Sequence, residues 1–207
     1  MNSKKLPIAV AITGASGVIY ALRLLEQLFK ADENVYLMIS QAGLVVLAME
    51  ENLQLGSNPK TIQKRLVEKF NCRPEQLQVF GEQDWLAPPA SGSAKLKGMV
   101  IIPCTTGTLG AVASGVSNCL INRAADVCLK EKTPLIMVVR ETPFSAIHLE
   151  NMLNLVNAGA TIMPANPAFY HNPSDIIGVV DYMVARVLDH LNIEQNLLAE
   201  WGKDNAE

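Results

Sequence analysis

The sequence has little charge and few aromatic side chains. Asp, Glu, Lys and Arg make up 18% of the 207 residues and Phe, Trp and Tyr 5%, whereas hydrophobic residues make up 49%. The formal net charge is −3 and the sequence contains no basic block, so nucleic acid is not an expected partner. The low charge fraction favours a large core together with wide contacts between subunits, and we therefore expect a homo-oligomer.

Long apolar runs and paired cysteines are also absent. No apolar run reaches the roughly 18–20 residues that span a bilayer, and the short one near the start runs directly into a glycine loop. Cys72, Cys104, Cys119 and Cys128 show neither a CxxC pair nor the spacing of metal ligands. We therefore expect a soluble cytoplasmic protein with reduced thiols, no membrane span and no bound metal.

Apolar, β-branched segments alternate with longer helical patterns along the whole chain. This alternation predicts right-handed βαβ units in a single α/β domain over residues 1–207, with a three-layer, doubly wound parallel sheet. The tail at about 192–207 carries Trp201, and we expect it to pack on the body or on a neighbouring subunit. The predicted strands are 8–13, 35–40, 99–103, 135–139 and 161–163; the helices are 18–29, 42–50, 61–70, 107–130, 146–158 and 174–191; residues 81–97 form a long loop.

The first strand leads into the small residues Gly14, Ala15 and Ser16 before a helix begins. Such residues let backbone N–H groups approach a phosphate at the helix N-terminus, and the alternative is a tight turn with Ser16 as N-cap. The motif is not GxGxxG, and the second strand ends in Ser40 without an acidic residue for a ribose diol. These features argue against NAD and favour a mononucleotide such as FMN.

Two further strand ends carry polar residues. The segment Thr105-Thr106-Gly107-Thr108 follows the third predicted strand and forms either a second anion cradle or an ordinary capped helix start. Arg140 and Glu141 follow the next strand, where an unpaired charge is costly. Arg140 suits a phosphate or a flavin carbonyl, and the alternative is a salt bridge between the two residues.

Several cations and one tyrosine stand apart from these junctions. Arg123 and Lys130 are seven residues apart on a predicted helix and therefore share a face, which could equally be a solvated one. Arg186 lies in the last predicted helix, and Tyr170 follows a proline-containing loop. For these two residues a surface or packing role is as plausible as ligand binding.

Two acidic residues and one tryptophan complete the candidates. Glu50 and Glu51 end a helix, where carboxylates oppose the helix dipole, so one of them is a candidate functional group. Trp85 lies in the long loop.

In combination, these motifs form a recognisable set. GASG after the first strand, Ser40, DWLAPPASGS, PCTTGT, NRAADVCLKE, VRETP and PAFYH occur in this order between about Ile8 and Trp201. The set closely resembles the UbiX/Pad-type flavin prenyltransferases, formerly labelled 3-octaprenyl-4-hydroxybenzoate carboxy-lyases. The family often has Ser where this chain has Thr105, and the hydroxyl is retained.

The resemblance implies a flavodoxin-like or Rossmann-like dodecamer. Such enzymes join a dimethylallyl group from dimethylallyl phosphate to N5 and then C6 of reduced FMN, without a metal. The product serves UbiD-type decarboxylases, in ubiquinone biosynthesis or aromatic acid decarboxylation. By resemblance, FMN contacts Gly14, Ala15, Ser16, Ser40, Thr105, Thr106, Gly107, Thr108 and Arg140; the donor contacts Arg123, Lys130, Tyr170 and Arg186; and the catalytic residues are Ser16, Glu50, Glu141, Trp85 and Lys130.

Two other classes of protein remain alternatives. A flavin-dependent decarboxylase of the peptidyl-cysteine type needs a histidine in the helix after the first strand, and residues 17–30 contain none. A passive FMN carrier would not need four cations together with Tyr170 and Trp85. The chain also lacks an adjacent Asp pair for Mg²⁺, so Arg and Lys would stabilise the leaving phosphate. We expect burial and phosphate charge to raise the proton affinity of Glu50.

Overall fold

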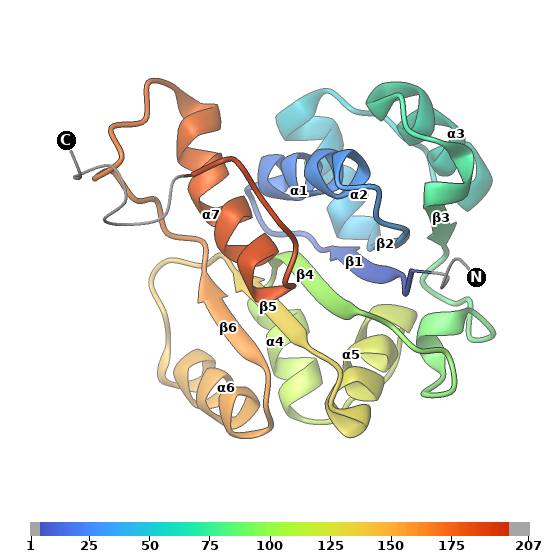
Figure 1. Cartoon of the computed structure of the whole chain (residues 1–207). Coiled ribbons are helices and arrows are strands. Elements are labelled where there is room, and N and C mark those ends of the chain that lie inside the picture. Colours follow the sequence, from blue (N-terminus) through green and yellow to red (C-terminus); the bar gives the residue numbers. More distant parts are fainter. Residues whose placement is uncertain (1–4, 199–207) are drawn as a thin grey trace.

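A six-stranded, all-parallel sheet forms the centre of the computed structural model, which describes residues 5–198 (Figure 1). The strand order is β3-β2-β1-β4-β5-β6, so the direction of winding reverses between β1 and β4. In such sheets ligands bind at this switch point, beyond the carboxyl ends of the strands. The strands are β1 (Ile8–Ile12), β2 (Val35–Ile39), β3 (Leu77–Phe80), β4 (Gly98–Cys104), β5 (Leu135–Val139) and β6 (Thr161–Pro164).

Helices cover both faces of the sheet. One face carries α1, α2, α3 and α7, and the other carries α4, α5 and α6 (Figure 1). The doubly wound, three-layer α/β architecture predicted from the sequence is therefore confirmed. The helices are α1 (Val18–Lys30), α2 (Gln41–Glu51), α3 (Pro59–Phe70), α4 (Thr106–Ala113), α5 (Leu120–Glu131), α6 (Ala146–Asn157) and α7 (Ile176–His190), with short 3₁₀ turns η1 (Pro74–Gln76) and η2 (Pro88–Ala90).

Strand β1 shows why its sequence is continuously apolar. Ile8, Val10 and Ile12 pack into the core under α1 and α7, whereas Ala9 and Ala11 pack into the core on the opposite face. All five residues of the strand are buried. Because successive side chains of a strand point to opposite faces, a strand covered on both sides has no polar position.

Two predictions from the sequence were wrong. Strand β3 was not predicted, because it is a four-residue edge strand in which Gln78 is exposed and interrupts the apolar run. The single helix predicted at 107–130 is two helices, α4 and α5. Gly115 adopts a left-handed φ of 68° between them, a conformation that glycine accepts readily and that ends the first helix.

The long loop and the tail are described in part. Residues 81–97 form a loop as predicted, with η2 as its one helical turn. Beyond α7, Ile193 is buried in the core and Leu197 packs against it. Trp201, on which the expectation for the tail depended, lies outside the described residues, so that expectation and the single-domain prediction for the whole chain stay predictions.

Candidate active site

Thr13 connects the two strands that flank the switch point. This residue is buried, and its Oγ1 donates a hydrogen bond to the Pro103 carbonyl at 2.7 Å. The same oxygen accepts a hydrogen bond from the Thr105 N–H at 2.9 Å. The end of β1 and the loop after β4 are thereby held in one position. No role was predicted for Thr13, whose only signal in the sequence is a hydroxyl at the end of a buried strand.

The start of α4 has the properties of an anion cradle. Thr105 is the N-cap, and its Oγ1 accepts from the Thr108 N–H at 3.1 Å and donates to Thr108 Oγ1 at 2.9 Å. The N–H groups of Thr106 and Gly107 are among the first in the helix and therefore have no intrahelical acceptor. A Cβ added to Gly107 would meet nothing closer than 3.9 Å, so the space above it is open. The helix start is therefore capped and retains unpaired N–H donors, and binding of an anion there stays a prediction.

The start of α1 differs from the prediction. Gly17, not Ser16, is the N-cap, and no side chain of the turn itself caps the helix. Instead, Glu50 Oε2 accepts hydrogen bonds from the N–H groups of Gly17 at 2.9 Å and Val18 at 3.1 Å. A carboxylate from α2 thus occupies the position at which a phosphate was expected, and it interacts favourably with the positive end of the α1 dipole.

These contacts also determine the charge state of Glu50. Burial alone would raise the pKa of Glu50, but hydrogen bonds from Ser16 and from the backbone at Gly17 and Val18 lower it, as does the positive charge of Arg140. The net result is a pKa below its ordinary value. The expectation of a raised proton affinity is therefore wrong for the protein without ligands, because the α1 N-terminus stabilises the ionised carboxylate.

Helix α2 is held close to the sheet. Ser40 caps it by accepting from the Gly43 N–H at 3.0 Å, and Glu82 Oε2 accepts from the Gln41 N–H at 3.2 Å. A Cβ at Gly14 would lie 2.4 Å from the Cβ of Ala42, and one at Gly43 would lie 2.7 Å from the Ile12 carbonyl oxygen. Both glycines therefore permit a close approach of backbones. Glu82 was not predicted to contact α2, because nothing in its local sequence indicates this contact.

Arg140 and Glu141 do not form the salt bridge that was considered as an alternative. Within residues 5–198, Arg140 has no ion-pair partner, although its charge acts on Glu50. Glu141 accepts hydrogen bonds from Thr106 Oγ1 at 3.4 Å and from the Thr142 N–H at 3.0 Å. An exposed, unpaired guanidinium beside the α4 cradle is available for an anion.

Tyr170 and Arg186 line a common cavity of about 610 Å³ at the β6 edge of the sheet. Its walls come from the end of β6, the following loop and the middle of α7. Arg186 forms an ion pair with Asp189 at 2.7 Å. The backbone N–H of Ala165 bonds to the Val139 carbonyl oxygen, so this cavity begins one strand away from Arg140.

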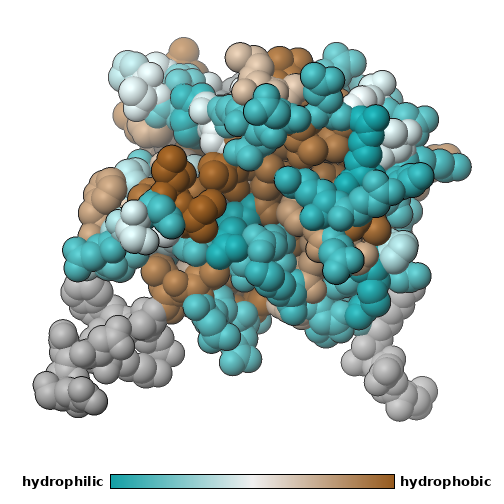
Figure 2. Space-filling model, turned by 90° about the horizontal axis from the view of Figure 1, so that it is seen from above, coloured by the Kyte–Doolittle hydropathy of each residue, from teal (hydrophilic) through white to brown (hydrophobic). Residues whose placement is uncertain are grey.

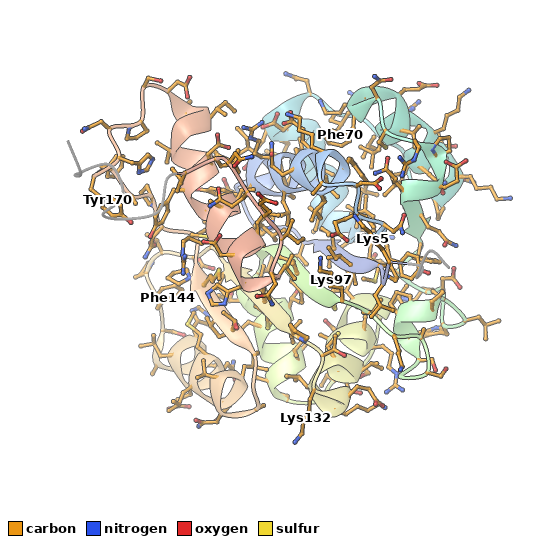
Figure 3. The ribbon with its side chains drawn as sticks, viewed as in Figure 1. Lys5, Phe70, Lys97, Lys132, Phe144 and Tyr170 are labelled. Atoms are coloured by element: carbon orange, nitrogen blue, oxygen red, sulfur yellow. The ribbon has the colours of Figure 1, made fainter. Side chains whose placement is uncertain are left out.

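Three other predicted site residues lie elsewhere. Lys130 stands near the end of α5, just before β5 begins, and is therefore at the amino-end edge of the sheet. Figure 3 shows the neighbouring Lys132 far from Tyr170. Arg123 Nε donates to the Ala90 carbonyl oxygen at 3.1 Å, and Trp85 is exposed in the loop after the outer strand β3. Within one chain, Lys130 and the cradle are separated by the length of β5, on the order of 15 Å.

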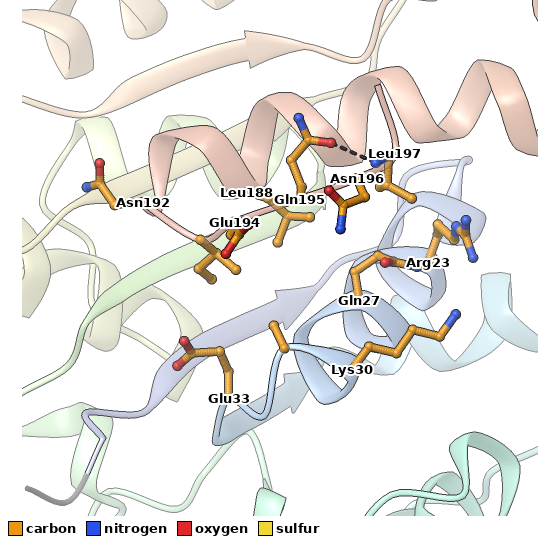
Figure 4. Close-up of a pocket in the computed structure, with 12 residues that line it drawn as sticks. Arg23, Gln27, Lys30, Glu33, Leu188, Asn192, Glu194, Gln195, Asn196 and Leu197 are labelled. Atoms are coloured by element: carbon orange, nitrogen blue, oxygen red, sulfur yellow. Dashed lines mark hydrogen bonds between the residues drawn. The ribbon is translucent and has the colours of Figure 1, made fainter. Parts of the chain in front are cut away.

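A separate polar cavity of about 640 Å³ lies between the end of α1 and the segment after α7 (Figure 4). Arg23, Lys30, Glu33 and Gln195 are among its lining residues. Glu33 stands just before β2, so this cavity is at the amino-end edge. None of the predicted site residues lines this cavity, so the candidate active site is the one at the carboxyl ends of the strands.

The Flavoprotein family matches residues 1–192 of the chain. The flavin prenyltransferase UbiX of Pseudomonas aeruginosa is 51% identical over 198 residues, which cover 96% of this chain and 95% of that protein. The chain belongs to the UbiX family of flavin prenyltransferases. UbiX of Alkalihalophilus pseudofirmus is 44% identical over 196 residues, covering 95% of this chain and 96% of the relative.

Solved structures agree with this membership. AnUbiX (PadA1), in complex with FMN and dimethylallyl pyrophosphate, is 34% identical with a TM-score of 0.85, covering 96% of this chain and 98% of that one. A dodecameric FMN-dependent UbiX-like decarboxylase from Escherichia coli O157:H7 is 32% identical with a TM-score of 0.81, covering 92% and 97%. The peptidyl-cysteine decarboxylase EpiD, at 14% identity and a TM-score of 0.58, shares the fold alone.

No helix in residues 5–198 is long and apolar enough to cross a membrane. In that same part of the chain, no group of three or more His, Cys, Asp or Glu side chains could hold a metal ion.

Proposed function

We propose that the chain is a flavin prenyltransferase that joins a dimethylallyl group from dimethylallyl phosphate to N5 and then C6 of reduced FMN. One observation carries the proposal for this site: the free N–H groups of α4 and the unpaired Arg140 stand together at the switch point of the sheet. A helix N-terminus and a guanidinium at one position form a site for a phosphate monoester. Membership of the UbiX family is consistent with this chemistry.

The residues at the carboxyl ends fit FMN. Thr105, Thr106 and Thr108 supply hydroxyls and Gly107 an open backbone for its phosphate. Arg140 provides the compensating charge. We assign Gly14, Ala15, Ser16 and Ser40 to the wall of the flavin site on the β1 and β2 side. When bound and reduced, the flavin supplies the nucleophilic N5 and C6 atoms.

The donor site would use cations in place of a metal. Breaking the allylic C–O bond places negative charge on the phosphate, and Arg and Lys side chains stabilise that charge. Tyr170 and Arg186 share a cavity near Arg140, and we assign them to the phosphate. Trp85 would offer an aromatic face to the positive charge that develops on the allyl carbon.

Lys130 is separated from the cradle of its own chain. We therefore propose that each site is completed by a neighbouring copy in a homo-oligomer, which we expect to be a dodecamer, and that this copy supplies Lys130 together with Arg123, which lies on the same helix. Exposed apolar side chains support such contacts: Met49 on α2 is 76% exposed and Ile147 on α6 is 68% exposed. Figure 2 shows a further apolar patch on the α7 side, where Ile176 is exposed.

Glu50, Ser16 and Glu141 are the proposed proton-handling groups. The lowered pKa of Glu50 keeps its carboxylate ionised at neutral pH, so it is ready to accept a proton rather than to donate one. Rearomatisation after attack by C6 requires such an acceptor. Ser16 bonds to Glu50, and its hydroxyl can pass a proton between the carboxylate and the flavin.

We further propose that prenylated FMN is released to a UbiD-type decarboxylase, in ubiquinone biosynthesis or aromatic acid decarboxylation. Metal-independent transfer and a cytoplasmic location stay predictions.

A direct test is to incubate the protein with reduced FMN and dimethylallyl phosphate and to record a mass spectrum of the released flavin. We expect a mass increase that corresponds to one five-carbon unit. Unchanged FMN, bound tightly and returned intact, would instead indicate a carrier and refute the transferase.

A further inference from the structure

Three aromatic rings gather where the loop after β6 meets the first turns of α7. His171 and Tyr182 are nearly parallel, with an interplanar angle of 12° and centroids 5.9 Å apart. Tyr170 stands edge-on to both, at 79° to His171 and 89° to Tyr182, with centroid distances of 5.9 Å in each case. Edge-to-face arrangements of this kind are favourable and directional.

His171 anchors this group to α7. Its Nε2 lies 3.2 Å from the Gly178 carbonyl oxygen, which can only accept, so Nε2 carries the proton and donates. Nδ1 is then an acceptor, and it is buried without a partner among the described residues. A buried acceptor without a partner is costly. The ring is therefore held in place by the Gly178 contact and by Tyr182, not by its second nitrogen.

Tyr182 contacts Tyr170 through its hydroxyl as well as through its ring. The two side chains form a hydrogen bond, which raises the pKa of Tyr170, and the charge of Arg186 opposes that change. Tyr170 and Tyr182 both line the cavity that contains Arg186. Tyr182 is on a helix and half-buried, whereas Tyr170 is 59% exposed on an irregular loop. Tyr182 is therefore the better fixed of the two residues, and Tyr170, which it orients, faces the solvent.

We propose that Tyr182 and His171 are positioning residues for the donor phosphate: they hold the Tyr170 hydroxyl beside Arg186 before the donor arrives. The inference rests on the function proposed above. An exposed side chain on a loop loses rotamer freedom when it binds a ligand, and this loss weakens affinity. The hydrogen bond and the ring contacts restrict Tyr170 in advance, so dimethylallyl phosphate meets a hydroxyl group that is already oriented.

The test compares Tyr182→Phe, Tyr170→Phe and the double variant. Tyr182→Phe keeps the ring and removes only the hydroxyl. One hydrogen bond of this kind corresponds to a factor of about 3–10, so we expect the KM for dimethylallyl phosphate to rise about 3–10-fold with kcat nearly unchanged. In the Tyr170→Phe background the same change should add less than about two-fold, because the group through which Tyr182 acts is gone.

Tyr36→Phe is the matched control. Tyr36 lies in β2 and packs edge-on against Phe80, away from the α7 cavity. Tyr36→Phe should leave the KM for dimethylallyl phosphate and the affinity for FMN unchanged. His171→Phe provides a second variant that retains an aromatic ring but loses the bond to Gly178, and it should raise the donor KM in the same direction. It replaces Tyr182→Phe if that variant has a lowered Tm or an altered oligomer size.

Phosphate binding gives a readout that does not require turnover. Inorganic phosphate is titrated calorimetrically into each FMN-loaded variant, and the losses should again be non-additive. If the wild type makes no prenylated flavin but shows this pattern, the transferase is refuted and the positioning role stands. Fully additive losses, an unchanged donor KM in Tyr182→Phe, or no phosphate binding by the wild type would each overturn the positioning role.

Discussion

The substitution Glu50→Gln separates two roles of one side chain, because Glu50 both caps α1 and is the proposed proton acceptor. Glutamine keeps the size and an acceptor oxygen, so the bonds from Gly17 and Val18 can persist, but without the negative charge. Hydrogen bonds to a charged group are stronger than neutral ones by about 1 kcal/mol. Since Glu50 is exposed and screened by solvent, we expect a loss of stability of about 0.5–1 kcal/mol.

This loss corresponds to a fall in Tm of about 1–4 °C for a chain of this size, measured at fixed protein concentration because oligomers are concentration-dependent. The lowered pKa of Glu50 gives the effect a pH dependence. Its carboxylate stabilises the fold above the unfolded pKa of about 4.3, and that contribution disappears as the pH falls through the lower folded pKa. The difference in Tm between wild type and Glu50→Gln should therefore be present at pH 7 and vanish in acid.

The effect on turnover should be much larger than the effect on stability. Glutamine cannot accept a proton, so we expect kcat to fall by about 10²–10⁴-fold, with FMN and donor affinities nearly unchanged. Glu51→Gln is the matched control, because Glu51 is the neighbouring residue on α2 and its side chain forms none of the described hydrogen bonds. Turnover is followed by mass spectrometry of the released flavin. Normal turnover in Glu50→Gln combined with a loss in Glu51→Gln would reverse the assignment.

Four further outcomes are expected. Arg140→Ala should weaken FMN binding about ten-fold in a flavin fluorescence titration, and unchanged affinity would remove it from the phosphate site. EDTA should leave prenyl transfer intact, whereas an absolute need for Mg²⁺ would show that the phosphate site is misassigned. The variants Lys130→Ala and Arg140→Ala should each have low activity alone. Co-expression of the two as mixed oligomers should restore activity, because some sites then combine an intact Lys130 from one subunit with an intact Arg140 from another. Activity cannot recover if both residues serve the site of the same chain. Thr13→Val leaves the Thr105 N–H without an acceptor, whereas the backbone N–H of residue 13 still donates to the Pro103 carbonyl. The substitution should therefore cost about 1–3 kcal/mol, measured as a lowered Tm.

Much of the fold follows from the sequence, because a strand covered on both faces has no polar position. Strands such as β1 and β5 are therefore visible as continuous apolar runs. Strand β3 pairs with β2 alone and exposes Gln78, so its short pattern does not differ from that of a loop. The division between α4 and α5 depends on the backbone at Gly115, and an isolated glycine within a helical pattern does not by itself predict a break.

The site is less predictable, because its contacts connect distant parts of the chain. The cradle at Thr105 could be predicted, since small and hydroxylated residues follow a buried strand. The capping of α1 by Glu50 could not, because the contact joins residues 33 positions apart and local sequence carries no sign of it. The position of Lys130 was predictable in principle: a residue just before a parallel strand must lie at the amino-end edge of the sheet.

The missing methyl group at Gly43 has a mechanical consequence. Gly43 and Glu50 are seven residues apart on α2 and so lie on the same face of the helix. The glycine lets the helix rest directly on the last carbonyl of β1. A methyl group at this position would move α2 away from β1, and the Glu50 carboxylate two turns along the helix would move with it. A displacement of about 1 Å can lower a rate by about 10²-fold. Gly43 therefore helps to determine the position of the Glu50 carboxylate, although it has no side chain of its own.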